Sequence, residues 1–174
     1  MTINIHPIIV HFPIAFLFLY SLIILLPVQK WFKNISWKTS EQLLLMTGTL
    51  GIFVAKASGS LAQQITQPNR QLSEMHELFA NATTWFYLIL LIIEFSPMII
   101  SYIRKKKNLS QKIKPLIKLL QRVYKLLNKN WIINTSALLG VISLFLTGLL
   151  GGVMVYGISA DPLAPFVLRI LGLI

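Results

Sequence analysis

The sequence predicts an all-α integral membrane protein, a bundle of four transmembrane helices with an amphipathic inner-surface helix between helices three and four. Hydrophobic residues make up 55 % of the chain and charged residues only 12 %, which is about half the charged share of a soluble domain. Four apolar stretches are long enough to cross a bilayer. The length of 174 residues leaves room for one domain, so we expect 1–174 to be a single membrane domain.

The first two spans are predicted at 7–26 and 41–64. His6 lies at the cap of the first span, and Pro7 takes the first helical position, where a missing N–H costs nothing. No Lys or Arg precedes this apolar run. We therefore expect a helix that is retained in the membrane and not a cleaved signal peptide.

The third and fourth spans are predicted at 74–102 and 131–156. Glu74 and Glu77 fall in the first turn of the third span, where a negative charge suits the positive end of the helix dipole. The tail, residues 158–174, is too short to span. We expect it on the outer surface.

Segment 111–129 predicts an amphipathic helix. Its apolar residues recur at helical spacing, and its cations mostly take the other face. The apolar positions are Ile113, Leu116, Ile117, Leu120, Tyr124 and Leu127. The cations are Lys112, Lys114, Lys118, Arg122, Lys125 and Lys129. We expect the helix to lie on the inner leaflet and bind anionic lipids; a docking surface for an acidic partner is the alternative.

The positive charge of the chain is clustered and predicts its orientation. Thirteen of the sixteen Lys and Arg residues lie in two segments, three in 29–40 and ten in 104–129. By the positive-inside rule both segments face the cytoplasm. We expect a multi-pass protein of the inner (cytoplasmic) membrane with both termini outside. The same clustering explains the net charge of +11 without a nucleic-acid partner, which such a charge would suggest in a soluble protein.

Small residues at four-residue steps predict where the helices pack. Lipid provides no hydrophobic drive for helix association, so small side chains must let the backbones approach. The positions are Thr47, Gly51, Ala55 and Gly59 in the second span, and Gly140, Gly148 and Gly152 in the fourth. A compact bundle follows from these stripes, and by themselves they do not indicate a cofactor.

Four ionisable residues at membrane depth are candidate functional residues, because such groups are costly inside a span. His11 lies about 6 Å below the start of the first span, and Lys56 about 12 Å from the outer end of the second, at the helical rise per residue. His6 caps the first span, and His76 is in the first turn of the third. All four belong to the outer half of the bilayer. A plain structural role, as a cap or a polar first-turn residue, is the alternative for His6 and His76.

Two chemistries suit histidines that face one another from different helices. One is axial ligation of a b-type haem. The other is a metal site of two or three histidines with a carboxylate from Glu77 or Asp161. His6 and His11 lie roughly 140° apart around a helix, so we expect His11 and His76 to ligate one iron and His6 to be a reserve ligand or a supporting neighbour. The absence of cysteine excludes thiolate and iron–sulfur sites.

Two charged side chains in the spans need partners. An unpaired Lys56 would be costly, so we expect it to meet Glu77 or the carboxylate of a bound group, such as a haem propionate. Glu94 lies near the cytoplasmic end of the third span. We expect an interfacial ion pair between Glu94 and Lys30 or Lys33.

The opening sequence HPIIVHFPIA, at 6–15, resembles a bacterial and archaeal family called domain of unknown function 2231. The likeness continues in Thr47-Gly48, in His76-Glu77 and in the closing sequence TGLLGGVMVYG at 147–157. The resemblance implies a four-helix membrane protein. Some family members are fused to or encoded with Rieske-type or other redox proteins, which implies electron transfer and haem. The basic segment 104–130 is longer than the family pattern, so an inner-side partner would be particular to this protein.

We therefore expect a membrane electron-transfer protein that binds one b-type haem near the outer face, with a redox protein or a larger membrane complex as its partner. Two alternatives stay open, a non-catalytic accessory subunit of a respiratory-type complex and a histidine metal-binding membrane protein. No phosphate-cradling G-x-x-x-x-G-K-[ST] loop is present, and no Ser or Thr has an evident neighbouring base. A redox carrier or an accessory subunit is favoured over a stand-alone enzyme.

Overall fold

Four long helices make up most of the protein in the computed structural model, which describes residues 4–66, 69–105 and 113–174. They are α1 (His6–Leu25), α3 (Trp37–Thr66), α4 (Arg70–Lys105) and α6 (Asn130–Tyr156). Each is long and apolar enough to cross a membrane, and the described residues contain no strand. The predicted all-α fold with four spans is confirmed.

The long helices extend beyond the predicted spans. α3 begins at Trp37, and α4 begins at Arg70 and continues to Lys105. Asn69 explains the early start of α4, because its Oδ1 accepts the N–H of Leu72 at 3.2 Å, as an N-cap side chain does. The additional turns are polar or charged, so hydropathy gave no sign of them.

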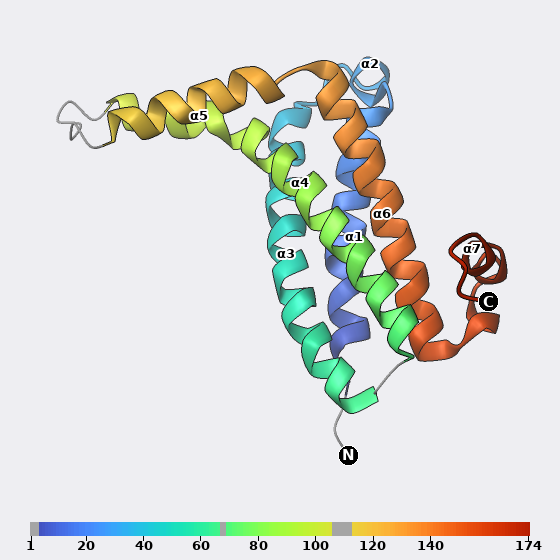
Figure 1. Cartoon of the computed structure of the whole chain (residues 1–174). Coiled ribbons are helices and arrows are strands. Elements are labelled where there is room, and N and C mark those ends of the chain that lie inside the picture. Colours follow the sequence, from blue (N-terminus) through green and yellow to red (C-terminus); the bar gives the residue numbers. More distant parts are fainter. Residues whose placement is uncertain (1–3, 67–68, 106–112) are drawn as a thin grey trace.

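Neighbouring helices run antiparallel in the order α1, α3, α4, α6 around the bundle (Figure 1). α1 packs mainly on α3 and α4 mainly on α6, while smaller contacts join α1 to α6 and α3 to α4. α1 and α4 therefore lie diagonally across the bundle. We call the end at which α1 and α4 begin the histidine end. The opposite end, where α2 (Val28–Trp31) joins α1 to α3, is the basic end.

The amphipathic helix between α4 and α6 is α5 (Lys114–Leu127). It runs beside the end of α4 and projects sideways from the bundle at the basic end (Figure 1). Residues 111–112 of the predicted segment lie outside the described residues.

The residues after α6 fold back against that helix. Gly157 ends α6 with a φ of 81°, a conformation that costs glycine little. After the single turn η1 (Ile158–Ala160), Asp161 Oδ1 accepts the N–H of Leu163 at 2.8 Å. The short helix α7 (Ala164–Ile170) follows and shares an apolar cluster with the end of α6.

Three residues of α1 pack directly against glycines of α3. A β-carbon built at Gly48 would lie 2.6 Å from Leu17 Cδ2, and one built at Gly59 would lie 3.1 Å from the Cε1 atom of His6. Pro13 packs in the same way against Gly51, which lies between Gly48 and Gly59. His6 and Leu17 are eleven residues apart, as are Gly48 and Gly59, which is about three helical turns on each helix. The contacts therefore fix the antiparallel register of α1 and α3.

The α4–α6 pair repeats this arrangement. A β-carbon at Gly151 would lie 3.2 Å from His76 Cε1, and one at Gly140 would lie 3.2 Å from Tyr87 Cε2. His76 and Tyr87 are again eleven residues apart, as are Gly140 and Gly151. The bundle thus consists of two similar helical hairpins, each with a histidine near the start of its first helix that lies on a glycine of the partner helix.

Tyr87 joins the two hairpins at the centre of the bundle. Its side chain is fully buried and meets Tyr20 edge-on, with ring centroids 6.4 Å apart. The phenol O–H donates to the carbonyl of Leu17 at 3.2 Å, and Ser21 Oγ lies 2.7 Å from the same oxygen. Because α4 and α1 are diagonal, this contact connects helices that otherwise touch little.

The contact between Gly48 and Leu17 leads to a stability prediction. Gly48→Ala places a methyl group against a side chain with no free space around it, and overpacking of this kind costs about 1–3 kcal/mol. Gly152 is a matched control, because no described atom lies within 4 Å of a β-carbon built there. Gly152→Ala should gain up to about 1 kcal/mol from helix propensity. Thermal unfolding in detergent should show a lower midpoint for Gly48→Ala and an equal or higher one for Gly152→Ala; the reverse order would contradict the packing.

Candidate functional histidine site

His6 lies half-buried between α1 and α3. Its Nδ1 is 2.9 Å from Ser58 Oγ, and its ring rests on Gly59. Ser58 Oγ donates its own hydrogen to the carbonyl of Ala55 at 3.0 Å, so it accepts from the imidazole. His6 therefore carries its proton on Nδ1 when the ring is neutral, and Nε2 holds the lone pair.

His76 has the equivalent position on α4. It is half-buried, its ring rests on Gly151, and its Nδ1 is 2.9 Å from the carbonyl oxygen of Thr147. A carbonyl oxygen only accepts, so Nδ1 is again the protonated nitrogen and Nε2 is the unprotonated one. His6 and His76 both lie toward the histidine end of the bundle, the first on α1 and the second on α4.

His11 lies elsewhere. Its side chain is exposed on the outside of α1, and its Nδ1 donates to the carbonyl of Pro7 in its own helix. The structure therefore brings His6 and His76 into one region of the bundle and leaves His11 outside it. The expected proximity of His11 to His76 is not found, because the 140° between His6 and His11 puts only one of them on the inward face of α1.

None of the three Nε2 atoms makes a hydrogen bond within the described part of the chain. A fixed Nδ1–H with a free Nε2 is the usual arrangement of a histidine that ligates a metal through Nε2, because the bond at Nδ1 sets the tautomer and the ring orientation. His6 and His76 combine this arrangement with partial burial, whereas His11 has it on the surface.

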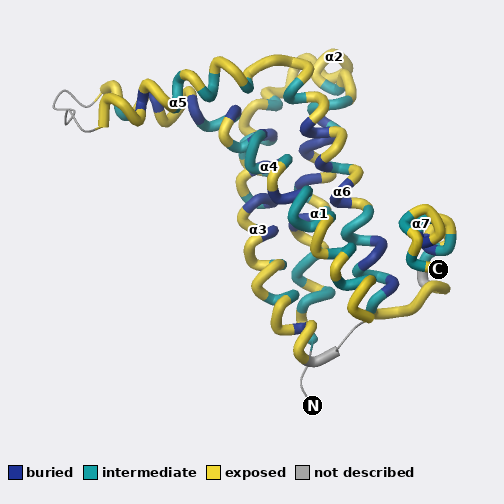
Figure 2. Tube along the Cα trace, viewed as in Figure 1, coloured by how far each residue is buried: buried dark blue, intermediate teal, exposed yellow. Residues whose placement is uncertain are grey.

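At the histidine end, the buried side chains come mainly from α6 and α7 and not from α1 and α4. Among the described residues, α1 has no buried position before Pro13 and α4 has none before Thr83. The main apolar cluster, which includes Leu17, Leu45 and Leu90, lies farther toward the basic end. Figure 2 shows buried positions gathered toward α2 and continuing along α6 to the histidine end. A second buried cluster, formed by Leu149, Leu150 and Val153 of α6 with residues of α7, packs against the first turns of α4 at the histidine end.

Lys56 pairs with an amide and not with a carboxylate. Its Nζ donates to Asn81 Oδ1 at 2.6 Å, while the expected partner Glu77 is exposed. Asn81 lies one helical turn beyond Glu77 on α4 and so is at the depth of Lys56. Ser58 and Asn81 were not predicted from the sequence; the signal for Ser58 was its place beside Gly59 in a stripe of small residues.

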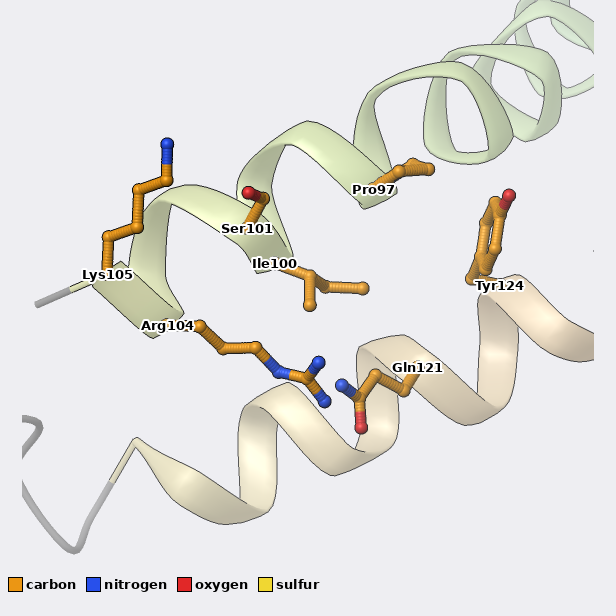
Figure 3. Close-up of a pocket in the computed structure, with 7 residues that line it drawn as sticks. All are labelled: Pro97, Ile100, Ser101, Arg104, Lys105, Gln121 and Tyr124. Carbon is orange, nitrogen blue, oxygen red and sulfur yellow. The ribbon is translucent and has the colours of Figure 1, made fainter.

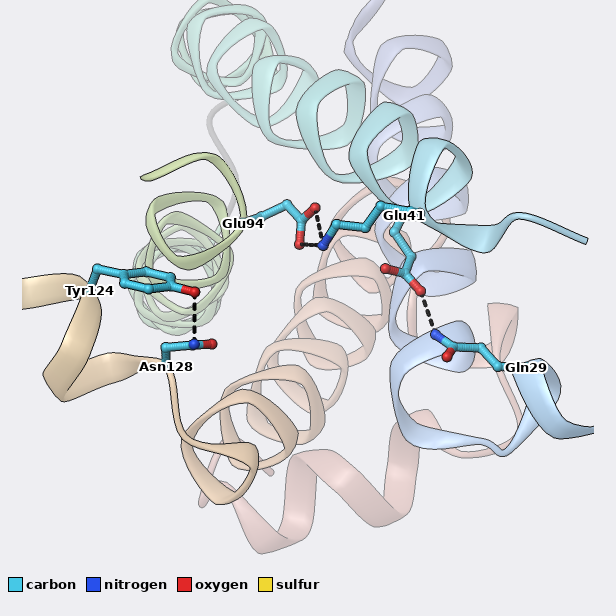
Figure 4. A network of polar contacts seen from close by, with 6 residues as sticks. Gln29, Glu41, Glu94, Tyr124 and Asn128 are labelled. Atoms are coloured by element: carbon cyan, nitrogen blue, oxygen red, sulfur yellow. Dashed lines mark hydrogen bonds and ion pairs between the residues drawn. The ribbon is translucent and has the colours of Figure 1, made fainter. Parts of the chain in front are cut away.

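A second polar cluster closes the basic end. Lys38 Nζ lies 2.7 Å from Oε1 and 2.8 Å from Oε2 of Glu94, and Gln29 Nε2 donates to Glu41 Oε1 at 2.7 Å (Figure 4). The prediction that Glu94 meets Lys30 or Lys33 is wrong. α3 begins at Trp37, so Lys38 is already in its first turn and faces α4.

No metal cluster of protein ligands is visible at either end. Within the described ranges, no group of three or more His, Asp or Glu side chains is arranged to hold an ion. The combination of His6, His76 and Glu77 that the sequence suggested as one metal option is therefore not assembled among these residues, since Glu77 points away from the bundle interior.

A family model described as "Predicted membrane protein (DUF2231)" matches residues 2–161. The chain belongs to this family. The match covers all four long helices, both glycine-packed histidines and α5, and it ends at the turn before α7. The family resemblance inferred from the sequence is confirmed, and so is its membrane character. Neither a search of curated proteins nor a search of solved structures gave a match.

The tautomers assigned above can be measured. With ¹⁵N-labelled histidine in the purified protein, the neutral rings of His6 and His76 should show a protonated Nδ1 and an unprotonated Nε2. His76→Gln and His6→Gln variants assign the two signals. An Nε2-protonated ring at position 76 would contradict the hydrogen bond to Thr147, because a carbonyl oxygen cannot donate to Nδ1.

Proposed function

We propose that this protein is a membrane electron-transfer protein that binds one b-type haem at the histidine end, with His6 and His76 as axial ligands. One observation carries the proposal. Two half-buried imidazoles from diagonal helices each have Nδ1 committed to a hydrogen bond and Nε2 free. The ligand pair differs from the His11 and His76 expected from the sequence, because His11 is exposed on the lipid-facing side of α1.

The number of donors favours haem over a bare metal ion. The porphyrin supplies four equatorial nitrogens, so a haem iron needs only two axial ligands from the protein. A structural zinc needs four protein ligands, and a catalytic zinc three. Two imidazoles match the haem requirement, and no three His, Asp or Glu side chains in the described ranges are grouped to hold a bare ion.

The chain would hold the ligands through their Nδ1 partners. The carbonyl of Thr147 and the hydroxyl of Ser58 fix the two ring planes, and a hydrogen bond at Nδ1 makes Nε2 a more basic ligand. A bound haem supplies one-electron transfer at its iron, with a potential set by the axial ligands and their hydrogen bonds. Lys56 offers an exposed ammonium in the same half of the bundle for a propionate.

We also propose that the histidine end faces the outside of the cytoplasmic membrane. The three cations of 29–40, and those of the ten in 104–129 that the structure describes, lie at the opposite end of the bundle. The positive-inside rule assigns such basic segments to the cytoplasm. Both termini and the proposed haem site would then be outside.

A non-catalytic accessory subunit of a larger membrane complex is the second candidate. The sideways projection of α5 from the bundle (Figure 1) supports it, since a lone four-helix bundle has no need of such an arm. Co-purification at fixed stoichiometry without a bound pigment would favour this function over the haem carrier.

The haem proposal is tested by a reduced-minus-oxidised absorption spectrum of the purified protein. Wild type should show the bands of a low-spin bis-histidine haem, and His6→Ala or His76→Ala should abolish or strongly reduce them. His11→Ala is the matched control and should keep full haem content. A wild-type protein without haem bands removes the function. Haem lost in His11→Ala but retained in His6→Ala removes the ligand assignment and restores the pair expected from the sequence.

The orientation is tested by labelling introduced cysteines, because the natural chain has none. Gln71→Cys, at the histidine end, and Asn34→Cys, at the basic end, replace exposed residues. A membrane-impermeant maleimide should label Gln71→Cys in cells with a permeable outer envelope and should label Asn34→Cys only after lysis. The opposite pattern would reverse the proposed orientation.

A further inference from the structure

A cleft of about 500 Å³ lies between the end of α4 and α5, at the basic end and away from the histidines (Figure 3). α4 contributes Pro97, Ile100, Ser101, Arg104 and Lys105, and α5 contributes Gln121 and Tyr124. Its volume is in the range of small-molecule sites. None of these residues takes part in the proposed haem site.

The α4 wall of the cleft changes from apolar to cationic along the helix. Pro97 and Ile100 come first, Ser101 follows, and Arg104 and Lys105 end the helix. At the helical rise, Pro97 and Arg104 are about 10 Å apart. A phospholipid has the same order, with apolar chains on one side of its phosphate, so the wall matches such a molecule in both chemistry and direction.

The lining of the cleft includes two cations, Arg104 and Lys105, and no carboxylate. Within the described residues, Arg104 makes no ion pair, and Figure 3 shows its guanidinium pointing across the cleft toward Gln121. Tyr124 accepts a hydrogen bond from Asn128 at 2.8 Å, which leaves its own O–H free to donate. A guanidinium that points toward an amide, in a cleft lining without a carboxylate, suits an anion with several acceptor oxygens.

The surface of α5 indicates that lipid headgroups lie beside the cleft. Its face toward α4 carries Ile117, which is buried. Leu116, Leu119 and Leu126 are exposed on a second face, and the cations from Lys114 to Lys125 lie on a third. A helix with an exposed apolar arc next to a cationic arc lies at the membrane interface. The cleft therefore opens at the level of lipid headgroups.

We propose that the α4–α5 cleft binds the phosphate headgroup of an anionic phospholipid, such as phosphatidylglycerol. Arg104 holds the phosphate, with a hydrogen bond available from Gln121, and one acyl chain follows the apolar wall of Pro97 and Ile100. Basic pockets between membrane helices bind anionic headgroups in this way. The site fastens α5 to the end of α4 through a lipid.

The test uses the full-length protein in mild detergent and native mass spectrometry with added phosphatidylglycerol, phosphatidylcholine or inorganic phosphate. Wild type should keep one phosphatidylglycerol, bind phosphatidylcholine less tightly, and not release the lipid to an equal concentration of phosphate. Arg104→Gln should weaken phosphatidylglycerol binding at least about tenfold, as expected for a lost hydrogen bond to a charged group. Arg122→Gln removes the same charge from the exposed cationic arc outside the cleft and should bind as wild type does.

A second variant tests the cleft and not the charge. Ser101→Trp replaces an exposed residue and fills the cleft, so it should also lose the lipid while circular dichroism stays unchanged.

Equal weakening of lipid binding by Arg104→Gln and Arg122→Gln would overturn the site in favour of a diffuse electrostatic attraction. Displacement by inorganic phosphate would identify the free ion as the ligand. Binding of an acidic protein with no lipid retained would replace the lipid with a protein partner.

Discussion

The close contact of side chains with glycine backbone is the constraint on which the bundle depends. In lipid, apolar side chains gain little from leaving their surroundings, so helices associate where surfaces fit closely. Leu17 and Pro13 meet glycines of α3, and Tyr87 meets Gly140 of α6. Each contact brings two helix axes together and fixes their relative height. The polar bonds between Tyr87, Ser21 and Leu17 then join the two hairpins.

The two histidines of the bundle follow from the same packing rule. His6 and His76 each occupy a glycine contact three turns from a large apolar one, so the hairpins place equivalent imidazoles at the same end. A histidine in such a contact loses orientational freedom, and its Nδ1 finds an acceptor on the facing helix. The geometry that stabilises the bundle therefore also orients two Nε2 atoms, which is the basis of the proposed haem site.

The two ends of the bundle differ in what they can bind. The histidine end has two half-buried imidazoles, with their Nδ1 atoms in hydrogen bonds, and a cation, Lys56, held by an amide. The basic end has an ion pair between Lys38 and Glu94 and a cleft whose lining includes two cations and no carboxylate. The histidine end therefore suits haem, and the basic end suits an anion. The proposed haem and the proposed lipid therefore occupy separate ends and can be tested separately.

The sequence by itself determined the number of spans, the amphipathic helix and the family, because hydropathy, charge clustering and short motifs are properties of the chain alone. The HPIIVHFPIA opening also identified two of the three candidate histidines, His6 and His11. Tertiary structure decided which of them meet. His6 and His11 are equally visible in the sequence, but only packing against Gly59 determines which face of α1 turns inward. Likewise, Lys38 reaches Glu94 because α3 begins earlier than its apolar run, and hydropathy carries no information about that polar first turn.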